Sequence, residues 1–268
     1  MSKFKILVLC LSISDITFVL EIQSFITIAD NDNGKDTVTY SCATLKHIIA
    51  GTFIFSFYQR FLICLKRLNA TFSTNNSYLH VITSPKGVCV GFVLIQVVMA
   101  LHLVNDITRG HKPCRTPSIL VPSFVLVADL PILLLCISIV GVYVVIIFRI
   151  ARQQSMNQNL GLGNARSADA MKKNAIILGI IIVVSLVGTM PRSILAVVSM
   201  LTGKAPTFFW RTLSNVLLLI NPLVDPIIYV FCVKEFRNKL KLFWSKIKNS
   251  IQLPNSRERC EDGAIALL

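Results

Sequence analysis

The chain has 268 residues, of which 54% are hydrophobic and only 15% are charged. A soluble domain of this length carries about 25% charged residues, so the composition favours a membrane protein. The formal net charge is +14, but the basic residues do not cluster with aromatic ones on a polar surface, which argues against nucleic-acid binding. The eight cysteines show no CxxC or similar metal-binding spacing, so a cysteine-ligated metal is not expected.

Six apolar segments are each long enough to cross a bilayer, which takes about 20 helical residues. They lie near residues 4–29, 39–65, 87–105, 119–148, 174–201 and 208–232. Polar segments separate them, including 71–87 and 152–173, and no internal repeat or separate soluble domain is evident. We therefore predict an all-α membrane bundle over residues 1–247 and a cytoplasmic tail over residues 248–268.

The distribution of Lys and Arg predicts the orientation of the bundle. With a cytosolic N-terminus, 18 of these residues lie on the cytoplasmic side and six lie outside, as the positive-inside rule requires. We expect both termini in the cytosol. A secretory signal peptide at residues 1–14 is the alternative, but the apolar run continues through residues 16–29, which is too long for a signal core.

The last apolar segment contains polar residues near its middle. Residues 218–231 read LLINPLVDPIIYVF and include Asn221 and Asp225. An Asp at the centre of a membrane helix is disfavoured by about 2.5–3.5 kcal/mol on insertion scales. Such residues persist where the helix faces protein or water instead of lipid. The segment therefore predicts a polar site inside the bundle.

Motifs at the ends of several segments resemble those of the rhodopsin-like (class A) G-protein-coupled receptors. Residues 225–229 (DPIIY) are similar to the N/D-P-x-x-Y motif of the family's last membrane helix. Residues 234–247 (KEFRNKLKLFWSKI) resemble the short amphipathic helix that follows it. The sequence LSISD (residues 11–15) is similar to the L-A-x-A-D motif of the family's second helix, so Asp15 corresponds to the acid of that motif.

The second apolar segment resembles the third helix of the same family. Cys42 precedes Arg67 by 25 residues, which matches the interval between the family's disulfide cysteine and its cytoplasmic Arg. Ser56 falls on the family's third-helix serine. The resemblance covers nearly the whole chain and implies a rhodopsin-like bundle, with six spans where the family has seven because the chain begins at the family's second helix.

The chain departs from the family pattern at several positions. The acid before the cytoplasmic Arg is Lys66, and the aromatic residue after it is Leu68. The sixth-helix Trp is Thr189, and the fifth-helix Tyr is Ile139. In the family, the acid restrains the cytoplasmic Arg in the resting state, and Lys66 cannot form that salt bridge.

The resemblance implies four groups of functional residues. A disulfide would join Cys42 to Cys114. A polar core, with a possible allosteric sodium ion as its only cofactor, would contain Asp15, Ser56, Asn221 and Asp225. Activation and G-protein coupling would use Arg67, Pro226 and Tyr229. The ligand pocket would include Glu21, Lys46, Asp129 and Arg192, although pairing of these two acids and two bases could instead serve only to hold the bundle together.

The predicted function is that of a plasma-membrane receptor that binds an extracellular ligand and activates a heterotrimeric G protein. The third-helix position where amine receptors keep an Asp is Ile49, so a peptide or a small polar ligand is expected. No paired catalytic carboxylates, nucleophile elbow or phosphate loop suggests an enzyme. The alternatives are an ion-coupled transporter, with Asp15 and Asp225 as the ion site, and a receptor-like association partner that does not signal.

Overall fold

The computed structural model describes residues 3–31, 40–72, 77–109, 122–159, 165–204, 207–232 and 242–247. Every regular element within these residues is a helix, which confirms the predicted all-α class. The chain divides into two compact units, Met1–Asp225 and Pro226–Leu268. The helical bundle belongs to the first unit.

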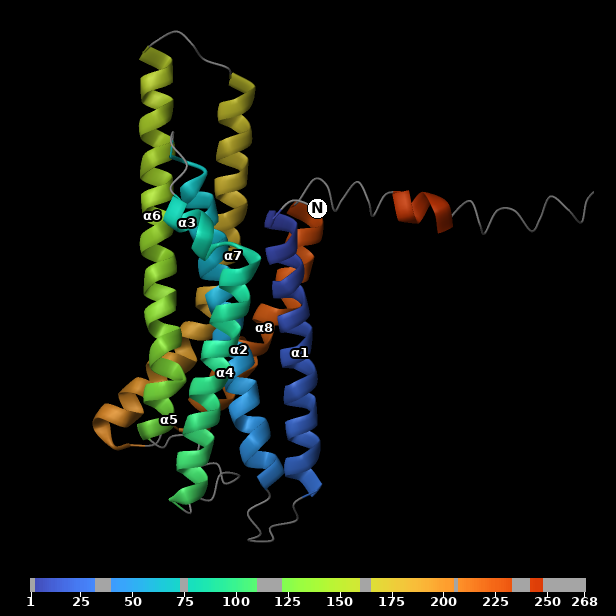
Figure 1. The fold of residues 1–268 in the computed structure, drawn as a ribbon, viewed down its shortest axis with the longest axis vertical. Helices are drawn as coiled ribbons and strands as arrows, with labels where there is room; N and C mark the ends of the chain where they lie inside the picture. Colours follow the sequence, from blue (N-terminus) through green and yellow to red (C-terminus); the bar gives the residue numbers. More distant parts are fainter. Residues whose placement is uncertain are drawn as a thin grey trace, which may run out of the picture. The chain divides into compact units, whose positions relative to one another are not determined.

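The helices follow one another along the chain as labelled in Figure 1. Their bounds are α1 Lys3–Asn31, α2 Tyr40–Asn69, α3 Ser77–Ile82, α4 Pro85–Thr108, α5 Pro122–Val127, α6 Asp129–Asn159, α7 Ala165–Thr202 and α8 Phe208–Cys232. A further helical turn covers residues 242–247 in the second unit. It lies within the predicted amphipathic helix at 234–247, and its Leu242, Phe243 and Trp244 side chains are exposed.

Five helices contain segments long and apolar enough to cross a membrane, so the chain is a multi-pass membrane protein. These segments are Leu9–Thr27, Ser41–Asn69, Pro85–Thr108, Ser123–Gln153 and Gly179–Thr202. The sixth predicted span forms α8, whose described apolar part, Phe208–Val224, is shorter. Large apolar side chains point outward from the bundle, as with Leu101 at 66% and Phe148 at 69% exposure. Such surfaces are suited to lipid tails.

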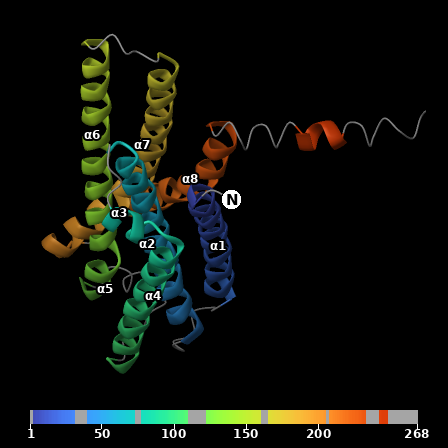
Figure 2. The ribbon, with the colours of Figure 1, turned by 45° about the horizontal axis from the view of Figure 1, so that its top comes forward.

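Helix α2 is the central helix of the bundle. In its apolar segment, 67% of the residues are buried, whereas the share is 17–39% in the other four spans. It packs against α1, α4 and α6, and Figures 1 and 2 both show it between α1 and α6. Aromatic contacts hold it on two sides: Phe53 stacks on Phe18 of α1 with ring centroids 5.0 Å apart, and Phe55 meets Phe92 of α4 at 4.9 Å.

The predicted span 119–148 is divided into α5 and α6. Pro131 has no N–H to donate to the carbonyl of Val127, so one continuous helix would lose this hydrogen bond. The chain turns at Ala128, and α6 begins at Asp129. An acid in the first turn of a helix interacts favourably with the positive end of the helix dipole. The break therefore places a carboxylate at a helix start inside the bundle.

The predicted loop at 152–173 is shorter in the structure. Helix α6 continues to Asn159, and α7 already begins at Ala165. Residues 152–159 contain neither Gly nor Pro, so nothing in this segment stops the helix at the end of the apolar run. Helix α7 ends at Thr202, where Gly203 takes a positive φ of 66°, the usual glycine termination of a helix.

Candidate functional site

A cavity of about 430 Å³ opens among α1, α2, α5, α6, α7 and α8. Its walls are mainly aromatic and aliphatic, with Phe18, Phe53, Phe124, Ile132 and Leu218 among the lining residues. Three charged side chains also line it: Lys46, Asp129 and Arg192. Small-molecule sites commonly combine such a volume with apolar walls and a few polar groups.

The charged side chains of the cavity are partly paired. Arg192 Nε lies 3.9 Å from Asp129 Oδ1. The Asp129 side chain is 7% exposed, whereas that of Arg192 is 32% exposed. Lys46 Nζ lies 4.0 Å from the centre of the Phe124 ring, a favourable cation–π position. Two bases and one acid thus line the cavity, and Lys46 also interacts electrostatically with Asp106, which lies outside the lining.

Glu21 does not line the cavity with the other three predicted pocket residues. It lies on α1, where its Oε1 accepts a hydrogen bond from Thr52 Oγ1 of α2 at 3.0 Å. This contact joins α1 to the central helix. The structure therefore brings together Lys46, Asp129 and Arg192 and places Glu21 in a helix-packing contact.

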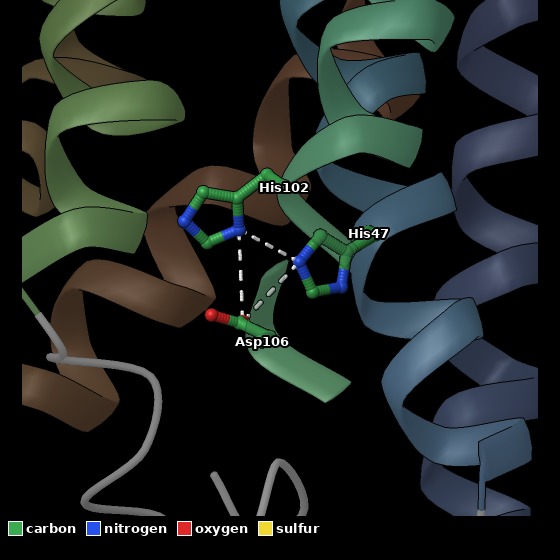
Figure 3. A group of neighbouring side chains, drawn as sticks. All are labelled: His47, His102 and Asp106. Atoms are coloured by element: carbon green, nitrogen blue, oxygen red, sulfur yellow. Dashed lines mark hydrogen bonds and ion pairs between the residues drawn. The ribbon is translucent and has the colours of Figure 1, made fainter. Parts of the chain in front are cut away.

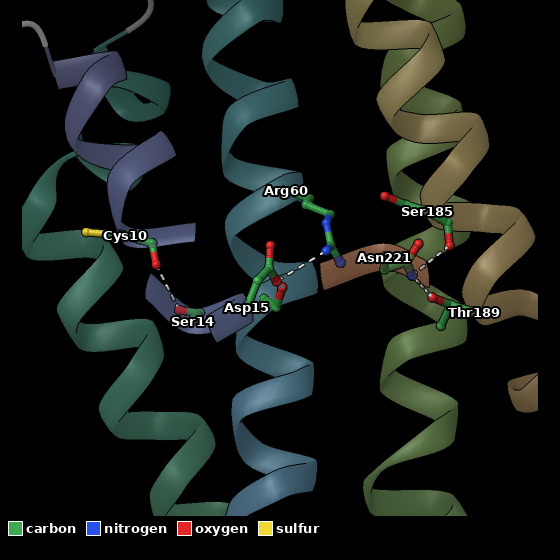
Figure 4. A network of polar contacts seen from close by, with 8 residues as sticks. Cys10, Ser14, Asp15, Arg60, Ser185, Thr189 and Asn221 are labelled. Atoms are coloured by element: carbon green, nitrogen blue, oxygen red, sulfur yellow. Dashed lines mark hydrogen bonds and ion pairs between the residues drawn. The ribbon is translucent and has the colours of Figure 1, made fainter. Parts of the chain in front are cut away.

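The predicted polar core has Asp15 of α1 at its centre (Figure 4). Ser56 Oγ donates a hydrogen bond to Asp15 Oδ1 at 2.7 Å, so two of the four predicted residues meet. The same carboxylate oxygen lies 3.4 Å from Arg60 Nη2 of α2, and the Arg60 and Asp15 side chains are 5% and 3% exposed. Asp15 is therefore one member of a buried ion pair.

Arg60 is the main residue that the sequence analysis missed. It lies inside an apolar run, but it follows Ser56 by four residues, so both side chains lie on the same face of α2. That spacing from a serine already assigned to the core was the available signal. The guanidinium is charged at every physiological pH, and it also lies 4.7 Å from the centre of the Phe57 ring.

Asn221 takes part in a separate polar contact between α8 and α7 (Figure 4). Its Nδ2 donates to Thr189 Oγ1 at 2.6 Å and to the Ser185 carbonyl at 3.3 Å, and the residue is fully buried. Thr189 therefore supplies a hydroxyl that anchors α8 to α7. Close approach depends on Gly188, where an added Cβ would lie 2.6 Å from Asn221 Oδ1.

The predicted activation residues lie within the last two turns of their helices. Arg67 is half-buried in the last turn of α2. Pro226 and Tyr229 belong to α8, but their side chains and that of Asp225 lie outside the described part of the chain. The roles of these residues stay predictions.

Only one of the two cysteines in the predicted disulfide, Cys42, belongs to the described residues. Cys42 is 1% exposed and is not among the free thiols of the described residues, which are Cys10, Cys64, Cys89 and Cys136. Cys114 lies outside the described residues. Its pairing with Cys42 therefore stays a prediction.

A second missed group lies between α2 and α4. His47, next to Lys46, faces His102 and Asp106, and all three residues are at most 8% exposed. Asp106 follows His102 by four positions in a mostly apolar helix, so the two residues share one face. Two ionisable residues at this spacing within a membrane span were the signal that the sequence offered.

No protein-family model matches this sequence, and no curated protein matches it. The resemblance to rhodopsin-like receptors therefore depends on the sequence motifs alone. Asp15 and Ser56, two of the residues that these motifs single out, are in contact.

Proposed function

We propose that this chain is a rhodopsin-like receptor of the plasma membrane, which binds an extracellular ligand and activates a heterotrimeric G protein. The observation that supports this most directly is the cavity lined by Lys46, Asp129 and Arg192. It lies in a bundle of apolar helices, has mainly apolar walls, and carries its few charges where a ligand would meet them.

Helix α2 provides a physical link between this cavity and the opposite end of the bundle. Lys46 lines the cavity, Ser56 and Arg60 contact Asp15 farther along the helix, and Arg67 lies in its last turn. From Lys46 to Arg67 is 21 residues, or about 32 Å at 1.5 Å per residue. This is about the thickness of the hydrocarbon core, so ligand and G protein would contact α2 on opposite sides of the membrane.

The chemistry of the cavity favours a peptide or a small polar molecule with apolar surface. Two of the three charged lining residues are bases, so a ligand carboxylate or other anionic group would find a favourable partner. The ligand acts by binding one arrangement of the helices better than another, because only such a difference shifts the equilibrium between them.

The test uses the full chain in lipid nanodiscs. Peptides and small polar acids are screened for an increase in unfolding temperature, and each hit is then tested for nucleotide exchange on purified G proteins. We expect Lys46→Met and Arg192→Met to weaken binding, while Lys86→Met, at an exposed base on α4, leaves it unchanged. Ligand-driven uptake of a labelled ion without exchange would indicate a transporter, and binding with neither effect would indicate an association partner.

A further inference from the structure

Three buried side chains converge between α2 and α4 (Figure 3). His47 Nε2 lies 3.0 Å from His102 Nδ1 and 3.4 Å from Asp106 Oδ2. His102 Nδ1 lies 3.6 Å from the same carboxylate oxygen. The three residues are 2%, 8% and 7% exposed. Two imidazoles and a carboxylate are thus gathered in an apolar setting, where such groups are costly, and Lys46 is a charged neighbour of the carboxylate.

A backbone carbonyl fixes the hydrogen of neutral His47 on Nδ1, the ring nitrogen that faces away from His102 and Asp106. Its Nδ1 lies 2.8 Å from the carbonyl of Ala43, and a carbonyl can only accept, so Nδ1 carries the hydrogen. In neutral His47, the lone pair of Nε2 therefore points toward His102 and Asp106. Metal-binding histidines are oriented in this way, with one ring nitrogen on a backbone carbonyl and the other on the metal.

The group lacks enough hydrogens to satisfy its own acceptors. With both imidazoles neutral, a hydrogen on His102 Nδ1 can be donated to His47 Nε2 or to Asp106 Oδ2, but a full hydrogen bond to both is not possible. If the hydrogen is on Nε2 of His102 instead, three acceptors face one another. A divalent cation would accept the lone pairs of His47 Nε2, His102 Nδ1 and Asp106 Oδ2 at once.

The separations suit a transition-metal ion. Three atoms 3.0, 3.4 and 3.6 Å apart lie on a circle of about 1.9 Å radius. Zn²⁺ binds His nitrogen at about 2.0–2.1 Å and carboxylate oxygen at about 2.0–2.2 Å. An ion slightly above the plane of the three atoms reaches all of them and keeps a fourth position open.

The donor set also selects among metals. Mg²⁺ and Ca²⁺ prefer six or more oxygen ligands, whereas imidazole suits zinc and its neighbours. The Phe124 ring of α5 meets the rings of His47 and His102 edge-on, with centroids 5.6 and 6.0 Å away. An apolar shell of this kind limits access of water and strengthens the interaction of the ligands with the ion.

We propose that His47, His102 and Asp106 bind a Zn²⁺ ion that clamps α2 to α4. The site is independent of the proposed receptor function. It borders the ligand cavity, because Phe124 and Lys46 line that cavity while Phe124 contacts both histidines. The ion therefore stabilises the packing that forms one wall of the cavity.

The experiment measures zinc binding by the full chain in nanodiscs after removal of metal with a chelator. Zn²⁺ is titrated against a chromogenic competitor, and the unfolding temperature is followed with Zn²⁺ and with Mg²⁺. We expect one high-affinity Zn²⁺ per chain and a higher unfolding temperature with Zn²⁺ only. Co²⁺ should give the strong visible absorption of a four-coordinate site, a readout that needs no variant.

Two variants remove ligands, and a third serves as control. Asp106→Asn keeps the side-chain shape, and His102→Ala removes a ring. Each should raise the Kd for Zn²⁺ at least ~100-fold, since even outer partners of metal ligands contribute 10–100-fold. His80→Ala, on the exposed helix α3, should bind as the wild type does. A wild-type chain that binds no Zn²⁺, or equal binding by all variants, would overturn the proposal. The Co²⁺ spectrum decides the matter if a variant fails to fold.

Discussion

The guanidinium of Arg60 on α2 lies 3.4 Å from the carboxylate of Asp15 on α1, with both side chains at most 5% exposed. Ser56, one helical turn before Arg60, donates a hydrogen bond to the same oxygen. The central helix is thereby joined to α1 by a buried ion pair as well as by the Phe18–Phe53 stack.

Breaking this ion pair should destabilise the bundle strongly. Arg60→Leu or Asp15→Asn alone leaves a buried charge without its partner, which costs about 3–5 kcal/mol in other proteins. The double variant should lose less than the sum of the two single losses. The free energy of unfolding in mixed micelles measures this, with Arg152→Leu at an exposed position of α6 as control. Additive losses would show that the pair is not coupled.

The same pair changes what is expected of sodium. The family resemblance implied a sodium ion in the polar core with Asp15 and Asp225, but Arg60 supplies a permanent cation beside Asp15. We therefore expect the wild-type unfolding temperature to be the same in sodium and in a large organic cation at equal ionic strength. In Arg60→Leu, sodium should raise it. A sodium effect in the wild type would restore the original prediction of a sodium site.

The contact of α8 with α7 should be sensitive to a single methyl group. An added Cβ at Gly188 would lie 2.6 Å from Asn221 Oδ1 and 2.9 Å from the Leu217 carbonyl, so Gly188→Ala should cost about 1–3 kcal/mol of stability. Gly141 on α6 has nothing within 4 Å of the corresponding position. Gly141→Ala should leave the stability unchanged or raise it. Equal effects of the two substitutions would argue against close α7–α8 packing.

Loss of the proposed disulfide should lower the amount of protein at the cell surface. Cys42→Ser and Cys114→Ser should each lower surface expression, and the double variant should be no worse, because each thiol matters only through its partner. Cys89→Ser, at an exposed free thiol of α4, is the matched control. Disulfide mapping by mass spectrometry that finds both thiols free would contradict the prediction.

The sequence predicted the helices well because their apolar runs are long and clearly bounded. It predicted helix ends less well, since α6 extends to Asn159 beyond the apolar run that defined the span. The span predicted at 119–148 contains Pro131, and the structure divides it there into α5 and α6. Whether a proline bends a helix or ends it depends on the packing around it.

Single polar residues were harder to interpret than motifs. Asp15 and Ser56 were assigned together because a family pattern relates them, and they are in contact. Arg60, His47 and His102 belong to no such pattern, and their partners lie 45 and 55 residues away along the chain. Only the packing of α2 against α1 and α4 reveals which of these groups meet.

The last prediction concerns Arg67 at the end of α2. In rhodopsin-like receptors an acid precedes this Arg and holds it in the resting state, but here the preceding residue is Lys66, which offers no carboxylate.

Replacing Lys66 with Asp should lower basal nucleotide exchange on purified G protein, because a charge-assisted hydrogen bond to Arg67 would stabilise the resting arrangement. Arg67→Ala should abolish agonist-driven exchange and leave ligand binding nearly intact, since the cavity lies toward the other end of α2. Lys86→Asp makes the same charge change at an exposed site on α4 and is the control for Lys66→Asp. If both Asp variants lower basal exchange equally, the effect is one of overall charge, and the proposed restraint on Arg67 is wrong.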